Sequence, residues 1–277
     1  MAFLVSEIQL IKSLVKNDFF NPFEIYIFTK NNLKITSMRL LLISNSTNAG
    51  EEYLEHAKDN IKDFLQKDDV KKVLFIPYAA VSFSYDEYQE KVQKRFSEFN
   101  VEVDSLHKYP HNKKKEAVKN AEAIVVGGGN TFHLVKQMQQ EDLIEIMRHA
   151  VLDGAPYIGW SAGSNVACPT ICTTNDMPIV EPDSFHALNL VRFQINPHYL
   201  DAHPDGHAGE TREMRINEYI IANPYVYTVG LREGCMFLIE NAEIKLIGNK
   251  HKQARIFKGD EEPEELSVDD DFDFLFE

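Results

Sequence analysis

A serine lies between two glycines in the segment Gly159 to Gly163 (GWSAG), directly after the apolar pair Tyr157 and Ile158. A Gly-X-Ser-X-Gly pattern between a strand and a helix is typical of a nucleophile elbow, a sharp turn that holds a serine hydroxyl above the edge of a sheet. We therefore predict that Ser161 is the nucleophile of an acyl-transfer reaction. The backbone amide of Ala162, at the start of the next helix, would donate a hydrogen bond to the oxyanion that forms.

A second glycine cluster, Gly127 to Gly129 followed by Asn130, comes directly after the apolar run Ala123 to Val126. Glycines allow the backbone to approach a substrate closely, and this loop would present a second oxyanion amide, that of Gly129. The competing interpretation is a loop that binds phosphate. Neither the GxxxxGK(S/T) nor the GxGxxG spacing is present, so nucleotide binding is disfavoured.

A serine hydroxyl needs a base to remove its proton, and the sequence contains ten histidines. His198 is the best candidate because it ends the segment Gln194 to His198 (QINPH), an apolar run that leads into a turn fixed by proline. A single histidine is more often structural than catalytic. Spacing does not exclude His186, His203 or His207.

The third residue of such a site is a carboxylate that orients the imidazole ring. On chemical grounds Asp176, Asp183, Asp201 or Glu233 would serve, and their spacing does not decide among them. The segment His203 to His207 (HPDGH) is similar to a metal-ligand cluster but lacks the HExxH helix spacing. We therefore expect no metal and no other cofactor.

The elements that would position these residues begin near Arg39, where short β-branched runs start to alternate with longer segments of helical periodicity. Such alternation is typical of a doubly wound, mostly parallel α/β sheet, which binds ligands at the carboxyl ends of its strands. Strands are predicted at Leu40 to Ser44, Val73 to Pro77, Val101 to Ser105, Ala123 to Gly127 and Tyr157 to Gly159. Helices are predicted at Glu51 to Lys67, Tyr85 to Glu98 and Phe132 to Leu152.

Beyond Pro197, prolines and glycines interrupt the chain before a predicted helix at Thr211 to Ala222. Short strands are expected after it, at Val226 to Leu231, Met236 to Ile239 and Glu243 to Ile247. We find no internal repeat.

The chain has 277 residues, enough for one domain with a sizeable core, and its net charge of −14 argues against binding to nucleic acid. No apolar stretch approaches the roughly 18 residues of a membrane span, so we expect no membrane partner. The three cysteines form no CxxC pair, which favours a reducing compartment, the cytosol.

Three parts of the chain are distinguished by composition. Residues 1–37 precede the alternating pattern as an extension of unknown role, and residues 38–258 form the predicted catalytic domain. From Asp260 to the end there are ten acidic residues and no basic ones, so residues 259–277 are expected to be a solvated, partly disordered tail. The apolar residues Phe272, Phe274, Leu275 and Phe276 leave docking of this tail open.

Six segments, taken in order, resemble peptidase E, a family of cytoplasmic serine dipeptidases that remove N-terminal aspartate. They are Leu40 to Ser46 (LLLISNS), Ile124 to Phe132 (IVVGGGNTF), Tyr157 to Ser164 (YIGWSAGS), Ala167 to Pro182 (ACPTICTTNDMPIVEP), Gln194 to His198 (QINPH) and Gly206 to Arg212 (GHAGETR). The resemblance covers about residues 39–258, far more than one short motif. It implies the flavodoxin-like sheet of the class I glutamine amidotransferases.

The resemblance also implies a role for each matching residue. Ser161 would be the nucleophile, and His198 the general base and then the general acid. Asp176 would be the carboxylate that orients the imidazole, with Glu233 as the alternative. The amides of Gly129 and of the residue after the nucleophile would form the oxyanion hole.

The implied substrate is a dipeptide with N-terminal aspartate (α-Asp-X), hydrolysed through a covalent acyl-enzyme. An aspartate side chain calls for a planar bidentate cation, which Arg212 would supply, although a surface ion pair is the plainer interpretation of this arginine. A free amino terminus needs an acidic acceptor, for which Glu210 and Glu233 are the candidates. We also expect Asn130, directly after the glycine cluster, to bind the substrate.

Two other functions fit the same residues. A cyanophycinase-like hydrolase would keep the serine chemistry and cleave β-aspartyl peptides, and a non-catalytic relative would only bind carboxylate ligands. For the dipeptidase the partner is a small peptide substrate (Asp-X), and we expect a monomer or homodimer. Arg232 stands before Glu233 where the resemblance leads us to expect a proline, a change that would alter the entrance of the site.

Overall fold

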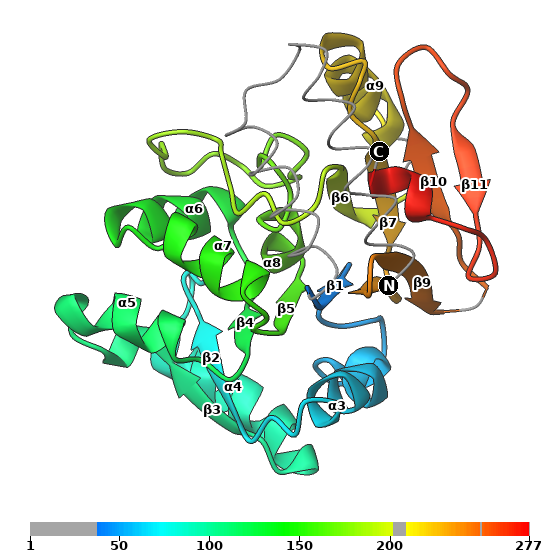
Figure 1. Ribbon diagram of the computed structural model, residues 1–277. Coiled ribbons are helices and arrows are strands. Elements are labelled where there is room, and N and C mark those ends of the chain that lie inside the picture. Colours follow the sequence, from blue (N-terminus) through cyan, green and yellow to red (C-terminus); the bar gives the residue numbers. More distant parts are fainter. Residues whose placement is uncertain (1–37, 202–208, 250, 277) are drawn as a thin grey trace, which may run out of the picture.

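The computed structural model describes residues 38–201, 209–249 and 251–276 of the chain. They form two sheets, the larger of which is surrounded by helices (Figure 1). The predicted N-terminal extension, residues 1–37, lies outside the described residues, and so do the candidate bases His203 and His207.

The larger sheet has seven strands in the order β3-β2-β4-β5-β1-β8-β9. These strands are β1 (Leu40–Ile43), β2 (Lys72–Ile76), β3 (Glu102–Ser105), β4 (Ile124–Val126), β5 (Tyr157–Trp160), β8 (Cys235–Glu240) and β9 (Glu243–Gly248). Strands β1 to β5 are parallel, and β8 and β9 extend the sheet in antiparallel fashion beside β1. This confirms the predicted doubly wound, mostly parallel sheet of a flavodoxin-like α/β fold.

The helices of the described residues lie in the predicted helical ranges, except α5, which was not predicted, and the short α8, which was expected only as a helix start after Ser161. They are α3 (Lys58–Gln66), α4 (Tyr85–Phe96), α5 (His111–Lys119), α6 (Thr131–Gln140), α7 (Ile144–Leu152), α8 (Ala162–Asn165) and α9 (Arg212–Ala222). Short 3-10 helices lie at Glu55–Ala57, Ser97–Phe99, Leu106–Lys108 and Asp273–Phe276. The predicted helix Phe132 to Leu152 is in fact two helices, because Asp142 adopts a positive φ of 50° between α6 and α7.

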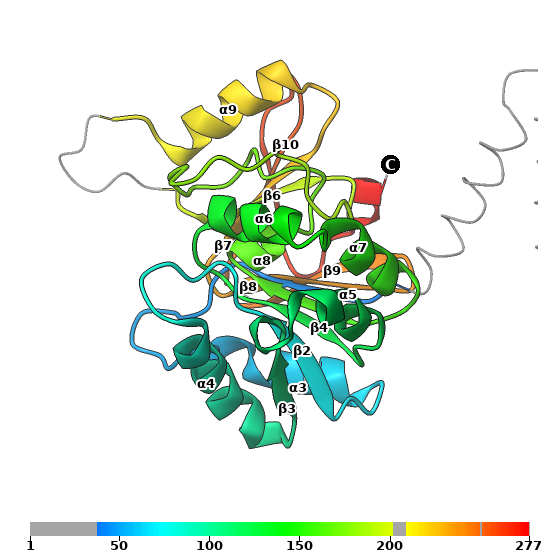
Figure 2. The same ribbon diagram turned by 90° about the vertical axis from the view of Figure 1, so that its left-hand side faces the viewer.

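Side chains along each parallel strand alternate between two apolar layers. In β1, Leu40 and Leu42 enter one layer and Leu41 and Ile43 the other, and all four are fully buried. Figure 2 shows α3 and α4 on one side of the sheet and α5 to α8 on the other. The sheet is therefore covered on both faces, which leaves the ends of its strands as the place for a ligand.

A second, four-stranded sheet has the order β11-β10-β7-β6. Its strands are β6 (Gln194–Tyr199), β7 (Thr228–Arg232), β10 (Ala254–Phe257) and β11 (Glu264–Leu266). Strand β6 corrects the expectation that an apolar run ends at a proline turn, because Pro197 lies inside the strand. The register of β6 against β7 shifts between Asn196 and Tyr199, and this irregularity accommodates the proline.

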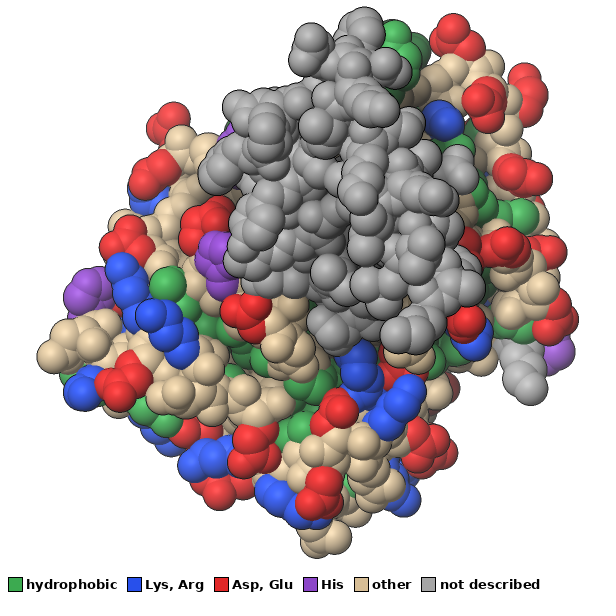
Figure 3. All heavy atoms as spheres, in the orientation of Figure 1, with side chains coloured by type: hydrophobic (Ala, Val, Ile, Leu, Met, Phe, Trp, Pro, Cys, Tyr) green, Lys and Arg blue, Asp and Glu red, His purple; other side chains and the backbone are tan. Residues whose placement is uncertain are grey.

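The acidic C-terminal segment packs against the body of the protein, so the expectation of a solvated tail is wrong. Phe272 and Leu275 are 0% and 1% exposed, and the Phe272 ring meets Phe237 edge-on at 5.3 Å between centroids. Figure 3 shows acidic side chains along the edge that β10 and β11 form in Figure 1, where Asp260 and Glu264 are exposed. Burial of these apolar side chains holds the segment in place, while water screens its exposed carboxylates, such as those of Asp260 and Glu264.

No helix within the described ranges is both long and apolar enough to span a membrane. Cys168, Cys172 and Cys235 are all unpaired thiols, and only Cys172 is exposed. The fold is thus held together without a disulfide between its own cysteines.

Candidate active site

Ser161 occupies a tight turn between β5 and α8. Its backbone has φ 54° and ψ −113°, a conformation that residues other than glycine rarely adopt. A Cβ atom on Gly159 would collide with the carbonyl of Gly163, and one on Gly163 would collide with the carbonyl of Val126. The turn therefore requires glycine on both sides of the serine, as the Gly-X-Ser-X-Gly pattern predicts.

The glycine loop after β4 lies against this turn because β4 and β5 are neighbours, with Val126 paired to Gly159. A Cβ atom on Gly128 would lie only 2.9 Å from Cβ of Ser161. Gly129 has φ 137°, and a Cβ atom there would collide with the carbonyl of Ala79. The backbone of the loop thus passes directly beside the serine, at a distance that only glycine permits.

The amides of Gly129 and Ala162 have no hydrogen-bond acceptor within the described part of the chain. A backbone amide without a partner is uncommon inside a protein, since its desolvation costs free energy. The two amides lie on the two segments that meet at Ser161. They are the donors that the sequence predicts for an oxyanion hole.

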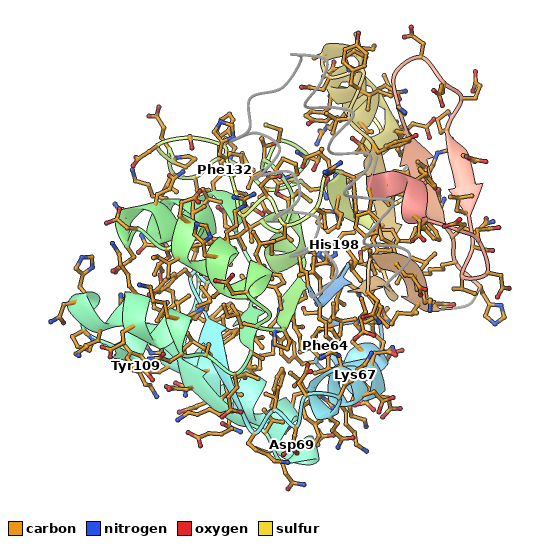
Figure 4. The ribbon with its side chains drawn as sticks, viewed as in Figure 1. Phe64, Lys67, Asp69, Tyr109, Phe132 and His198 are labelled. Carbon is orange, nitrogen blue, oxygen red and sulfur yellow. The ribbon has the colours of Figure 1, made fainter. Side chains whose placement is uncertain are left out.

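His198 contacts the serine. Its Nε2 atom lies 2.9 Å from Oγ of Ser161, within hydrogen-bond range. His198 has a positive φ of 54°, at the point where the register of β6 shifts. Figure 4 labels His198 near the end of β1. The local irregularity of β6 thus directs the imidazole toward the carboxyl ends of the parallel strands.

Ser44, directly after β1, holds the backbone of His198 in this conformation. The amide of His198 donates to Oγ of Ser44 over 2.9 Å, and that hydroxyl donates to the carbonyl of Leu231 over 2.7 Å. Ser44 is fully buried. Sequence reasoning misses this residue, although its position after a parallel strand, at the edge where ligands bind, was an available signal.

Glu233 is the carboxylate that contacts His198. Its Oε1 atom lies 2.8 Å from Nδ1 of His198. Glu233 and Gly234 form the short connection between β7 and β8. The amide of Gly234 donates to Oδ1 of Asn45, and Nζ of Lys252 donates to the carbonyl of Glu233. These two hydrogen bonds fix the loop that carries the carboxylate.

Asp176, the first choice for this position, does not contact His198. Its Oδ2 atom accepts hydrogen bonds from the amide of Thr131 at 2.7 Å, the Thr131 hydroxyl at 2.6 Å and the Thr174 hydroxyl at 3.2 Å. Asp176 therefore fastens the loop after α8 to the first turn of α6, where a negative charge is favourable. The expectation that Asp176 orients the imidazole is therefore wrong. The carboxylate in contact with the imidazole is that of the alternative, Glu233.

Of the other carboxylates and histidines considered from sequence, those that the structure describes are engaged elsewhere or lie at the surface. Asp183 pairs with Lys136, and Asp201 pairs with Arg232. His186 is exposed and takes part in an isolated bridge with Thr170. None of them contacts Ser161 or His198 within the described residues.

Arg212 is the first residue of α9, whose N-terminus is capped by the hydroxyl of Thr211. Burial lowers the pKa of Arg212, and the negative charges of Glu233 and Asp176 act in the opposite direction. No ion pair of Arg212 occurs within the described ranges, which argues against the surface-pair interpretation. A half-buried guanidinium close to the carboxylates of the site is suited to an anionic ligand.

The remaining substrate-binding candidates have structural contacts. Oδ1 of Asn130 caps α6 by accepting from the amide of His133, and its Nδ2 donates to the carbonyl of Met177. Glu210 is exposed and lies 3.5 Å from Nε of Arg215. The structure thus accounts for both residues without a ligand.

Arg232, which was expected to alter the entrance of the site, forms ion pairs with two acidic residues. Its guanidinium donates to both oxygens of Asp201 and to both oxygens of Glu265. These hydrogen bonds raise the pKa of Arg232. Arg255 also donates to Glu265 and to Glu213 on α9. Through the carboxylate of Glu265, in the C-terminal segment, this network connects the parts of the chain that carry His198, Glu233 and Arg212.

Comparison with known proteins agrees with this geometry. The model of peptidase family S51 matches residues 40–247. A peptidase E of Nostoc sp. is 54% identical over 241 residues, which cover 87% of this chain and 98% of the relative. A peptidase E of Shigella flexneri is 45% identical, over 81% of this chain and 96% of the relative.

Solved structures show the same fold. The crystal structure of a peptidase from an acI-B1 Actinobacterium aligns with a TM-score of 0.63 at 16% identity, over 86% of this chain and 98% of that one. A structure from Listeria monocytogenes aligns with a TM-score of 0.54 at 22% identity, over 83% and 99%. The family match spans most of the chain, and the relatives are similar along nearly their whole length. The chain therefore belongs to peptidase family S51, and it is a serine-type dipeptidase.

Proposed function

We propose that this protein hydrolyses dipeptides with N-terminal aspartate, α-Asp-X, through an acyl-enzyme on Ser161. The observation that carries the proposal is a continuous hydrogen-bonded chain. Oγ of Ser161 lies 2.9 Å from Nε2 of His198, and Nδ1 of the same ring lies 2.8 Å from Oε1 of Glu233. In this arrangement Glu233 keeps the proton of the neutral imidazole on Nδ1, so that Nε2 is free to accept the serine proton.

In the first half of the reaction Oγ of Ser161 attacks the carbonyl carbon of the aspartyl residue while His198 takes its proton. The carbonyl oxygen becomes an oxyanion, which accepts hydrogen bonds from the amides of Gly129 and Ala162. The tetrahedral intermediate collapses, the C–N bond breaks, and His198 returns its proton to the leaving amine. The products of this half are the free second residue and an aspartyl ester of Ser161.

The second half uses water in place of the amine. His198 takes a proton from the water as it attacks the ester, and the same two amides receive the oxyanion. His198 then gives the proton to Oγ of Ser161 as aspartate leaves. One peptide bond is hydrolysed, and the site returns to its starting protonation state.

Selection for aspartate is assigned to Arg212. A guanidinium without an ion-pair partner in the described ranges offers two parallel N–H groups to the substrate carboxylate. For the amino terminus, Glu233 is favoured over Glu210 because its Oε2 atom has no partner among the described residues, while Glu210 is exposed near Arg215. The site would then recognise both charged ends of an N-terminal aspartate.

The partner is a small peptide, the proposed location is the cytoplasm, and the proposed assembly is a monomer or homodimer. The three unpaired thiols support a reducing compartment. Light scattering on the purified protein measures the assembly, and fractionation of the source cells measures the location.

A substrate panel tests the proposal. It compares an α-Asp-X dipeptide with Glu-X, Ala-X, N-blocked Asp-X and β-aspartyl dipeptides. Turnover confined to free α-Asp-X is expected, whereas preference for the β-aspartyl link would point to a cyanophycinase-like hydrolase. Binding of aspartate without any turnover would point to a non-catalytic relative.

Replacement of Arg212 separates recognition from chemistry. Arg212→Met is expected to lower kcat/KM for Asp-X at least about 100-fold, since a charge-assisted bidentate contact is lost. Arg215→Met, on the exposed side of the same helix, is the matched control and is expected to change little. Equal effects of the two replacements would contradict the assignment of Arg212.

A further inference from the structure

We infer that Tyr88 of α4 is a positioning residue for this reaction, because its hydroxyl fixes the orientation of the Gly128–Gly129 peptide and thereby aims the Gly129 amide at the oxyanion. The inference deepens the proposed function and rests on it. Tyr88 is far from Ser161 in the sequence and belongs to no motif of the sequence analysis.

The contacts of the Tyr88 hydroxyl determine where its proton lies. The hydroxyl lies 2.9 Å from the carbonyl oxygen of Gly128 and 3.1 Å from Nε1 of Trp160. An indole nitrogen only donates and a carbonyl only accepts. Tyr88 therefore accepts from Trp160, and its single proton is directed to the carbonyl of Gly128.

This hydrogen bond orients the next amide. In a trans peptide the C=O of one residue and the N–H of the next point in opposite directions. With the Gly128 carbonyl held toward Tyr88, the Gly129 N–H points away from Tyr88. The loop at Gly128 adjoins Ser161, and the Gly129 amide has no acceptor within the described residues.

The loop needs such an external restraint. Three consecutive glycines have wide conformational freedom, so their peptide planes are poorly fixed by local preferences. The Tyr88 hydroxyl is well placed to supply the restraint, since a Cβ atom on Gly127 would lie 2.6 Å from it. The hydroxyl also connects the loop to Trp160, the residue that precedes the nucleophile. One group thus links the two segments that carry the oxyanion amides.

The tyrosine is rigid and stays protonated. Tyr88 is 3% exposed, and its ring meets those of Phe75 and Phe83 edge-on at 5.0 Å and 5.1 Å between centroids. Burial raises the pKa of Tyr88 to about 12, so the hydroxyl remains a donor at any pH at which the enzyme works. The ring contacts remain when only the hydroxyl is removed, which makes Tyr88→Phe a clean variant.

The test compares wild-type protein with Tyr88→Phe. The expected result is a fall in kcat for Asp-X of about 10- to 100-fold with KM nearly unchanged, less than the loss of an entire oxyanion donor. Inhibition by an aspartyl aldehyde, which forms a hemiacetal oxyanion with Ser161, is expected to weaken by a similar factor. Inhibition by β-alanine, which keeps the amino group and the side-chain carboxylate of aspartate but has no carbonyl group at the oxyanion position, is expected to stay the same.

Tyr85→Phe is the matched control. Tyr85 lies one turn earlier on the same helix and its ring packs against Tyr78 at 5.5 Å between centroids, but its hydroxyl has no hydrogen bond to the glycine loop within the described ranges. Its removal is expected to leave kcat within about twofold. Thermal unfolding of both variants shows whether each is folded at the assay temperature.

Two results would overturn the inference: unchanged kcat and aldehyde inhibition in Tyr88→Phe, or equal losses in Tyr85→Phe. Labelling of Ser161 by a fluorophosphonate probe provides a readout that does not depend on the substrate, because that reaction also develops charge at the oxyanion hole. If wild-type protein is labelled but does not cleave Asp-X, the proposed substrate fails. A slower labelling rate in Tyr88→Phe would then still support the role of Tyr88, and an equal rate would refute it.

Discussion

The Nδ1 atom of His198 lies 2.8 Å from Oε1 of Glu233, although the two residues are 35 positions apart and belong to different strands and loops. His198 is placed by an irregular strand and Glu233 by a short connection between two sheets. The nucleophile, in contrast, is placed by its own local turn. The position of Ser161 is thus determined by its local sequence, whereas His198 and Glu233 are brought together only by the tertiary fold.

Replacement of Glu233 is expected to lower activity more than replacement of Asp176. In Glu233→Gln the amide no longer holds a proton on Nδ1 of His198, so kcat should fall about 10²- to 10⁴-fold. Asp176→Asn keeps the shape of its side chain but weakens the contacts with Thr131, so it should mainly lower the unfolding temperature. Steady-state kinetics and thermal unfolding of both variants measure this. The reverse order of the kcat losses would restore Asp176 as the third residue.

Removal of the Ser44 hydroxyl is expected to affect catalysis and stability together. Ser44→Ala removes the acceptor of the His198 amide and a donor to the carbonyl of Leu231. The free energy of unfolding should fall by about 1 to 3 kcal/mol, and kcat by about 10- to 100-fold because the imidazole is displaced. Ser105→Ala is the control, since this serine is also buried but lies on the edge strand β3, where its hydroxyl hydrogen-bonds to His107 and to no residue of the site within the described ranges. A similar loss of kcat in the control would contradict a specific role for Ser44.

The ionic network around Glu265 predicts a pH-dependent stability. Burial would raise the pKa of Glu265, but hydrogen bonds from Arg232 and Arg255 lower it below its usual value. A carboxyl group with a lowered pKa in the folded state stabilises the protein above its unfolded pKa, about 4.3 for glutamate, and this contribution is lost as the pH falls further.

Glu265→Gln should therefore lower the free energy of unfolding by about 1 to 3 kcal/mol at pH 7. The difference from wild type should shrink as the pH falls below about 4. Glu264→Gln, next to it and exposed, is the control. Urea unfolding over this pH range gives the comparison, and a difference that grows toward acid would contradict the predicted sign.

The C-terminal segment is expected to be necessary for stability. Phe272→Ala removes a fully buried ring and should lower the free energy of unfolding by about 3 to 5 kcal/mol. Asp269→Ala, exposed and three residues away, should change it by less than about 0.5 kcal/mol. Denaturant unfolding measures both. Nearly equal stability of Phe272→Ala and wild type would mean that the segment does not dock in solution.

The sequence predicted the parts of the structure that depend on local pattern. The five parallel strands of the larger sheet and the turn at Ser161 follow from short runs of residues whose conformational preferences agree with the fold. Helix α5 escaped prediction because only Lys114 and Val118 are buried on it, too few to give a helical period of apolar residues. The fold class was therefore accessible from sequence, but the full set of elements was not.

The choice between Asp176 and Glu233 could not be made from spacing. Both are carboxylates that follow polar or glycine-containing segments. Glu233 meets His198 because β6 pairs with β7, whereas Asp176 is held by the first turn of α6. The docking of Phe272 was missed for a related reason. Ten acidic residues dominate the composition of the tail, while its stability comes from a few aromatic side chains that pack in the hydrophobic core.

The most direct test of the account is hydrolysis of an α-Asp-X dipeptide by wild-type protein and by Ser161→Ala, without added metal. The account predicts turnover by wild type and a loss of at least about 10⁴-fold in kcat for the variant, with aspartate still bound. Hydrolysis by Ser161→Ala at the wild-type rate would contradict it, because the reaction would then proceed without the serine that the whole site is built around.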